Sequence, residues 1–161
     1  MTVKEDAVLR PDKQPGLFGS VYIGPGASVL ALDGDLNCHL VREWKYPLHS
    51  YSLEVISGGR DGEESFEECA RRELREEAGL ASERLIDLGT METITTIVTA
   101  PVRLFLALEA TPKPGMPGPD EFLEVVKIPF TEVLNMAMTG KLQHAATLIT
   151  VLRAGILLKM V

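Results

Sequence analysis

The sequence predicts a single α/β domain in which helices cover a mixed β-sheet. Short apolar or β-branched runs recur along the chain, a few helical patterns alternate with them, and no internal repeat or long linker interrupts the series. The 161 residues suffice for one domain with a substantial core. We expect residues 20–161 to form that domain. Residues 1–19 are polar and contain Pro11, Pro15 and Gly16, which predicts a flexible lead or a short edge hairpin.

The strands are predicted from apolar and β-branched runs bounded by turn-forming residues. Two of these runs flank Asp33-Gly34-Asp35, a sequence typical of a β-hairpin turn. The predicted strands cover residues 20–23, 27–32, 38–43, 52–56, 85–90, 102–108 and 122–128.

Three helices are predicted from the signals at their ends. The first follows a glycine-rich loop, has Ser65 as candidate N-cap and stops at Gly79. The second has Thr131 as candidate N-cap, runs to Thr139 and is stopped by Gly140. The third covers roughly residues 142–158.

The first helix places carboxylates on the same face as its apolar residues. Glu73 and Glu77 share a face with Phe66 and Ala70, and Glu76 lies at its edge. Acids in the last turns also oppose the helix dipole, by roughly 0.3–1 kcal/mol for each charge. A bound divalent cation with hard oxygen ligands would offset this cost. The alternative is a solvated helix held by Glu–Arg pairs.

Composition narrows the class of protein further. The net charge of −7 and the lack of a basic run argue against nucleic-acid binding, and an anionic substrate would require a local cation. Cys38 and Cys69 lack metal-ligand spacing and are expected to be buried, reduced thiols. We find no membrane-length apolar stretch and no signal-peptide pattern, so no membrane association and a cytoplasmic location are expected.

The glycine loop and first helix resemble the Nudix box, the signature of hydrolases that act on nucleoside diphosphates linked to another group. The family pattern is Gly, five residues, Glu, seven residues, Arg-Glu, a bulky apolar residue, any residue, Glu-Glu, any residue, Gly and a bulky apolar residue. Every specified position is filled in register, by Gly58, Glu64, Arg72, Glu73, Leu74, Glu76, Glu77, Gly79 and Leu80. The resemblance implies a Nudix-type α/β/α sandwich with a mixed β-sheet between helices.

Segments outside the box resemble the ADP-ribose and ADP-sugar pyrophosphatase branch. Residues 41–47 and 52–54 resemble the segment before the box, and residues 112–115 and 120–126 resemble a later acidic loop and strand. The resemblance implies metal-dependent hydrolysis of a nucleoside diphosphate sugar, with ADP-ribose giving AMP and ribose 5-phosphate. The alternatives are a nucleoside triphosphate or dinucleoside polyphosphate pyrophosphatase, and a non-catalytic nucleotide sensor with the same fold.

The resemblance also implies a metal site for Mg²⁺, with Mn²⁺ as the alternative ion. The implied ligands are Glu73, Glu77, the carbonyl oxygen of Ser57 and, through water, Glu64. An equal alternative for Glu64 is a structural pairing with Arg72. Arg72 is expected to orient the carboxylates, Glu76 to assist them, and Gly58 to allow the chain close to the metal.

Three residues before the box are candidates for substrate binding. Trp44 either stacks on a nucleobase or lies in the core or a dimer interface. Lys45 occupies a position where the branch often has arginine, and would bind phosphate as a point charge. Glu54 either contacts a ribose, supports the metal ligands or is only a loop acid. The histidines show no ligand spacing and are expected to be structural or solvated.

The general base is expected outside the loop at residues 94–101, which contains neither the glycine nor the carboxylate found there in many relatives. Glu121 is the first candidate, followed by Asp120 and Glu92. Many relatives dimerise through a strand-rich N-terminal extension. The region before Ser20 is shorter than that extension, so we expect a homodimer of different form.

Overall fold

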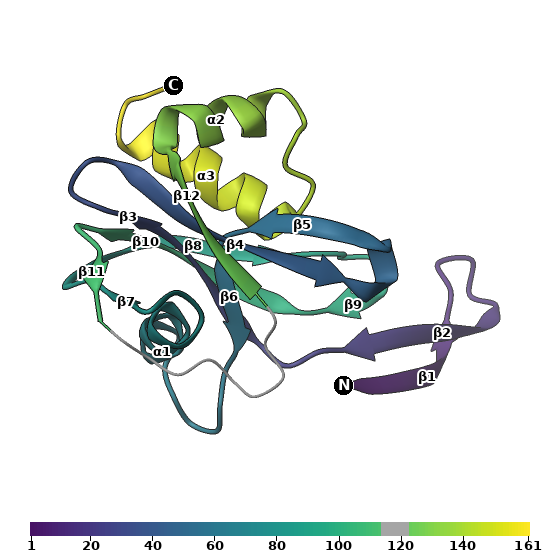
Figure 1. Cartoon of the computed structure of the whole chain (residues 1–161). Coiled ribbons are helices and arrows are strands. Elements are labelled where there is room, and N and C mark those ends of the chain that lie inside the picture. The colour runs from purple at the N-terminus through teal and green to yellow at the C-terminus, as the bar shows by residue number, and fades with distance from the viewer. Residues whose placement is uncertain (114–122) are drawn as a thin grey trace.

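The computed structural model describes residues 1–113 and 123–161 and contains three α-helices within this part of the chain (Figure 1). The helices are α1 Phe66–Ala78, α2 Phe130–Met138 and α3 Ala145–Leu157, and Tyr46–Leu48 form a 3₁₀ helix. The strands are β1 Thr2–Leu9, β2 Pro15–Tyr22, β3 Gly26–Leu32, β4 Asn37–Lys45, β5 Ser50–Glu54, β6 Ile56–Gly59, β7 Leu80–Ala81, β8 Arg84–Glu92, β9 Val98–Thr99, β10 Pro101–Leu108, β11 Thr111–Pro112 and β12 Leu123–Pro129.

A mixed sheet in the order β12-β4-β3-β10-β8 forms the centre of the molecule, with β5 paired to β4 and β6 paired to β3. The β3–β10 pair is parallel, whereas β12–β4 and β10–β8 are antiparallel. Because side chains alternate along a strand, β3 contributes side chains to the apolar layers on both faces of the sheet. Leu30 and Leu32 pack with α2 and α3, whereas Val29 and Ala31 pack with α1. The predicted α/β/α sandwich with a mixed sheet is therefore confirmed.

The predicted strand at 52–56 is wrong in one respect, because the structure divides this segment into β5 and β6. β5 pairs with β4, whereas β6 pairs with β3. Between them, the Val55 N–H donates to Thr147 Oγ1 of α3 at 2.9 Å. That tertiary hydrogen bond takes Val55 out of a strand ladder, and β6 then continues through Gly58 and Gly59, which the sequence placed in a loop.

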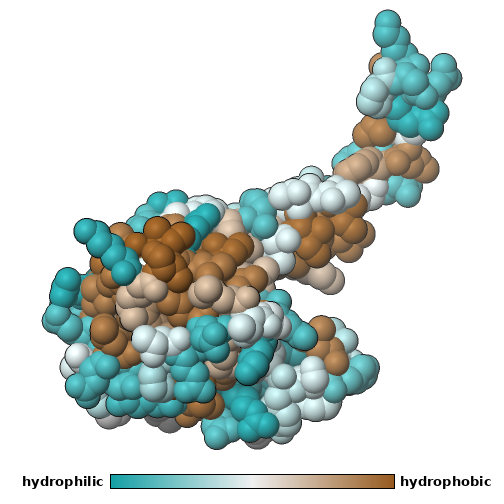
Figure 2. All heavy atoms as spheres, turned by 90° about the horizontal axis from the view of Figure 1, so that it is seen from above, coloured by the Kyte–Doolittle hydropathy of each residue, from teal (hydrophilic) through white to brown (hydrophobic). Residues whose placement is uncertain are grey.

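The predicted strand at 20–23 is too short, because β2 begins at Pro15. It also lies outside the central sheet, in a sheet of the order β1-β2-β9. β2 pairs antiparallel with β1 over its whole length and parallel with β9 at Val21 and Tyr22. The β1–β2 hairpin projects from the body (Figures 1 and 2). Figure 2 also shows apolar side chains along the arm near the body and hydrophilic ones at its tip.

The ends of α1 agree with the prediction, whereas α2 and α3 differ. Ser65 Oγ accepts the Glu68 N–H while Glu68 accepts the Ser65 N–H, which is a complete capping box. α2 has Pro129 rather than Thr131 as its N-cap. α3 begins only after His144, whose extended backbone precedes the helix. No helix in the described ranges is long and apolar enough to cross a membrane.

Both cysteines are buried and free, as predicted. Cys38 packs in the layer beneath α2 and α3, whereas Cys69 packs beneath α1, so the sheet separates the two thiols. Burial raises the pKa of the Cys69 thiol to about 11. Each cysteine therefore serves as a small apolar core residue.

Asp33 organises the turn between β3 and β4. Its Oδ1 accepts the backbone N–H groups of Asp35 at 3.0 Å and Asn37 at 2.9 Å, and its Oδ2 lies 2.6 Å from Lys127 Nζ on β12. Burial alone would raise the pKa of Asp33, but the hydrogen bonds from Lys127 and Asn37 outweigh it and hold the pKa well below its usual range. The carboxylate thus joins three neighbouring segments of the sheet.

Replacing Asp33 by asparagine should lower the free energy of unfolding by about 1 kcal/mol at neutral pH, since Lys127 is half-exposed and solvent weakens its pairing. A carboxyl group whose pKa is lowered in the folded state stabilises the fold at pH values above its unfolded pKa of about 3.9. This contribution is lost as the pH falls through the folded-state pKa. The difference from the wild type should therefore shrink in urea titrations below pH 4. Asp35→Asn, an exposed change in the same turn, is the control, and an equal loss there would contradict this role.

Candidate active site

Gly58 lies directly against the carboxylate of Glu73. A Cβ added at Gly58 would lie 1.8 Å from Glu73 Oε1 and 2.0 Å from its Cδ, far inside van der Waals contact. Glu73 is only 7% exposed, so α1 and β6 hold its carboxylate between them. A residue with any side chain at position 58 would displace this acid.

Glu77 is connected to the same strand one residue earlier. The Ser57 N–H donates to Glu77 Oε2 at 3.1 Å. The Ser57 hydroxyl donates to the Val55 carbonyl at 3.0 Å and lies 2.8 Å from the buried hydroxyl of Ser28 on β3. These bonds fix the backbone at Ser57, and Ser57 in turn positions Glu77. Sequence reasoning did not identify Ser28, since its role depends on the β3–β6 register.

Arg72 is the centre of the carboxylate cluster. Its guanidinium donates to Glu73 Oε1 at 2.6 Å, to Glu76 Oε2 at 3.1 Å and to Glu64 Oε1 at 2.8 Å. It also donates to the Gly59 carbonyl at 2.8 Å. One cation thereby orients acids from α1 and from the preceding loop. Hydrogen bonds from Arg72 and from the Asp61 N–H lower the pKa of Glu64 to about 2.

The carboxylates fit a divalent cation by chemical type, because hard cations prefer oxygen ligands. In the described ranges, however, no three His, Cys, Asp or Glu side chains converge closely enough to hold a metal ion. At this site Glu64, Glu73 and Glu76 are all paired with Arg72. Binding of an ion would therefore require at least one carboxylate to exchange its contact with the guanidinium for the metal.

Lys45 and Glu54 come together with His144 at the start of α3. Glu54 Oε2 lies 3.5 Å from Lys45 Nζ and 3.3 Å from His144 Nδ1, and Lys45 also pairs with Glu43. His144 Nδ1 lies 2.9 Å from Thr147 Oγ1. Burial lowers the pKa of His144, opposed by the Glu54 charge. Sequence reasoning treated His144 as structural or solvated and did not place it beside Glu54.

Trp44 is 47% exposed, which excludes the core alternative. Its ring meets Tyr51 edge-on, with centroids 5.3 Å apart, and the Arg42 guanidinium lies 4.4 Å from the Tyr51 ring centroid. The nucleobase and interface alternatives for Trp44 remain.

Two of the three base candidates, Asp120 and Glu121, lie outside the described residues. The third, Glu92, ends β8, and its Oε2 accepts the Ala100 N–H at 3.1 Å. That bond connects the end of β8 to the far end of the loop at residues 94–101, so Glu92 has a structural role here.

The central sheet between helices and the carboxylate-rich helix packed on a glycine strand define a class of α/β/α sandwich proteins. The chain belongs to the NUDIX domain family, whose model matches residues 23–149. It is 34% identical over 128 residues to the ADP-sugar pyrophosphatase of Mus musculus, an alignment that covers 74% of this chain but only 58% of the mouse protein.

Two further comparisons extend this result. The ADP-ribose pyrophosphatase of Bacillus subtilis (strain 168) is 28% identical over 126 residues, covering 76% of this chain and 68% of that protein. A crystal structure of an ADP compounds hydrolase superposes with a TM-score of 0.83 at 19% identity, covering 99% of this chain and 94% of that chain. At this identity the superposition establishes a shared fold.

Proposed function

We propose that this protein is a Nudix pyrophosphohydrolase that cleaves the pyrophosphate bond of a nucleoside diphosphate sugar, with ADP-ribose as the first candidate. The observation that carries the proposal is the Glu73 carboxylate held against Gly58, with Arg72 and the other acids of the box around it. The relatives named for ADP-sugar and ADP-ribose support this substrate class.

Glu73 and Glu77, with the Ser57 carbonyl and Glu64 through water, would hold the divalent cation, Mg²⁺ or alternatively Mn²⁺. The chemistry that such an ion would supply when bound is neutralisation of the charge that develops on the diphosphate oxygens and activation of the phosphorus centre toward water. Arg72 keeps the acids in position before the ion arrives, assisted by Glu76. Since Glu64, Glu73 and Glu76 share one arginine here, ion binding would also relieve repulsion among them.

Substrate contacts are assigned to the exposed Trp44, stacking on the base, to the adjacent Lys45, and to Glu54, whose Oε2 lies 3.5 Å from Lys45 Nζ. Glu121 is the proposed general base, with Asp120 and Glu92 as the next candidates. Glu121→Gln should then lower kcat while leaving Mg²⁺ affinity near that of the wild type. A normal kcat in this variant would transfer the role to Asp120 or Glu92.

Incubation with ADP-ribose and Mg²⁺ should yield AMP and ribose 5-phosphate, which chromatography separates and measures. EDTA should abolish the reaction. ADP-glucose, GDP-mannose, a nucleoside triphosphate and a dinucleoside polyphosphate run in parallel define the substrate class. Faster cleavage of either polyphosphate would favour the alternative pyrophosphatase. Binding of ADP-ribose without turnover of any compound would favour a nucleotide sensor.

A homodimer in the cytoplasm completes the proposal. A two-stranded hairpin is marginally stable alone, and β1–β2 exposes the large apolar side chains of Val3, Leu9, Leu17 and Phe18. A second copy of the chain would cover them. Light scattering after size-exclusion chromatography should give twice the monomer mass, and Phe18→Ser with Leu17→Ser should shift it toward the monomer. A monomeric wild-type protein at micromolar concentration would contradict the dimer.

A further inference from the structure

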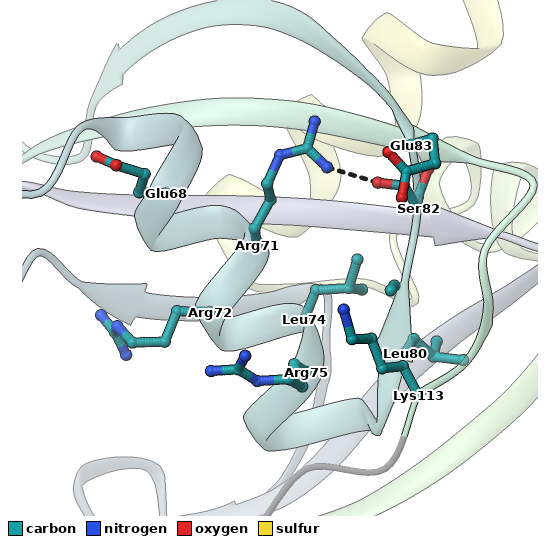
Figure 3. Close-up of a pocket in the computed structure, with 10 residues that line it drawn as sticks. Glu68, Arg71, Arg72, Leu74, Arg75, Leu80, Ser82, Glu83 and Lys113 are labelled. Carbon is teal, nitrogen blue, oxygen red and sulfur yellow. Dashed lines mark hydrogen bonds between the residues drawn. The ribbon is translucent and has the colours of Figure 1, made fainter.

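A cavity of about 420 Å³ lies beside α1, between that helix and the chain around β7 (Figure 3). Arg71 and Arg75, which line it, are each two residues from Glu73 and therefore lie nearly opposite it on the helix. The cavity thus opens on the side of α1 away from the Gly58–Glu73 contact. Its volume falls in the range of small-molecule binding sites.

Basic side chains predominate around this cavity. Arg71, Arg72, Arg75 and Lys113 line it, against the acids Glu68 and Glu83. Glu68 is committed to the capping box of α1. In a chain of net charge −7, such a local excess of cations is not a general property of the surface. Arg72 is committed to Glu64, Glu73 and Glu76, so Arg71, Arg75 and Lys113 are the cations that would meet an anion in the cavity.

The cations retain the capacity to bind a ligand. Arg71 uses Nε and Nη2 on Glu67 and Nη1 on the Ser82 carbonyl, which leaves one N–H on each terminal nitrogen. Arg75 is 47% exposed, with its Nη2 at the outer limit of ion pairing, 4.0 Å from Glu76 Oε1. Figure 3 shows Arg71 turned toward Ser82, and Lys113 on the other side of Leu74.

The cavity also has an apolar part. Leu74 and Leu80 are almost fully buried and contribute to its lining, together with Ala81. The two leucines form the buried floor of the cavity, and the partly exposed Ala81 is the apolar side chain that a ligand can cover. A ligand with both a phosphate and a flat ring would use the basic rim and the apolar lining at once.

We infer that this cavity is a second ligand site, which shares only Arg72 with the candidate active site, and that it binds a phosphomonoester carrying an apolar ring, such as a nucleoside monophosphate. Arg75 and Lys113 contact the phosphate, aided by Arg71, and the ring lies against Ala81 above the buried Leu74 and Leu80. The site does not depend on the proposed hydrolase activity, because none of these contacts requires metal or turnover.

The test is a titration of the full chain with AMP in EDTA, which prevents metal-dependent binding at the carboxylates. Amide chemical shifts in ¹H–¹⁵N spectra locate the site, and calorimetry gives the affinity. We expect saturable shifts at Ala81 and Ser82, weaker binding of inorganic phosphate, and weaker binding of adenosine. Shifts confined to the surroundings of Trp44, or no saturable binding, would overturn the site.

Variants identify the residues responsible. Arg75→Gln and Lys113→Gln should each weaken AMP binding about twofold to fivefold, as expected for partly exposed charge pairs. Lys141→Gln removes an exposed charge elsewhere and should leave the affinity unchanged. Glu77→Gln should also leave it unchanged. Equal weakening in Lys141→Gln would indicate only nonspecific attraction, and unchanged affinity in both cavity variants would disprove the assignment.

Discussion

Glu77→Gln is expected to lower kcat/KM for the cleaved nucleotide by about 10²- to 10³-fold at saturating Mg²⁺. The loss follows from removing one negative ligand of the ion that stabilises the transition state, an effect of several kcal/mol. Glutamine still presents a carbonyl oxygen to the Ser57 N–H, which lies 3.1 Å from Glu77 Oε2, so the fold should be retained. Product chromatography measures kcat/KM, and a Mg²⁺ titration establishes the concentration that saturates the variant.

The matched control on the same helix is Glu67→Gln. Glu67 pairs with Arg71 at 2.8 Å on the outer side of α1 and is exposed. Its replacement removes the same charge without touching β6, so kcat/KM should remain within about twofold of the wild type, as for most surface substitutions. A comparable loss in both variants would mean that the total charge of α1, rather than Glu77, sets the rate.

Gly58→Ala is expected to abolish most activity and to destabilise the fold by about 1–3 kcal/mol, the usual cost of overpacking. The new methyl group would occupy the position of the Glu73 carboxylate, 1.8 Å from Oε1. The backbone at Gly58 does not have a positive φ, so alanine is compatible with the local conformation. The effect therefore comes from the contact with Glu73, and urea unfolding together with the product assay measures it.

Two comparisons make this prediction specific. Gly59→Ala should be nearly neutral for stability, since nothing lies within 4 Å of a Cβ there. In a Glu73→Ala background, Gly58→Ala should cost much less stability than in the wild type, because the clashing carboxylate is gone. Full additivity of Gly58→Ala and Glu73→Ala would contradict a direct contact between the two positions.

Much of α1 was predictable because its determinants are local. Ser65 and Glu68 form the capping box within one turn, and Gly79 ends the helix with φ 61°. Helical periodicity likewise placed Glu73 and Glu77 on the face that packs against β6. By contrast, α2 begins at Pro129 although Thr131 is the better capping residue by type. The chain enters α2 directly from β12, whose last pair joins Pro129 to Asn37.

The sequence by itself determined the α/β class, the position and ends of α1, and the register of the carboxylate motif, because each depends on residues a few positions apart. Only the tertiary structure decided that Thr147 interrupts the strand at Val55, that Gly58 abuts Glu73, and that Glu54 meets His144. Each of these contacts joins segments distant in the chain. Their formation depends on how β6 and α3 pack on the sheet, which no local pattern specifies.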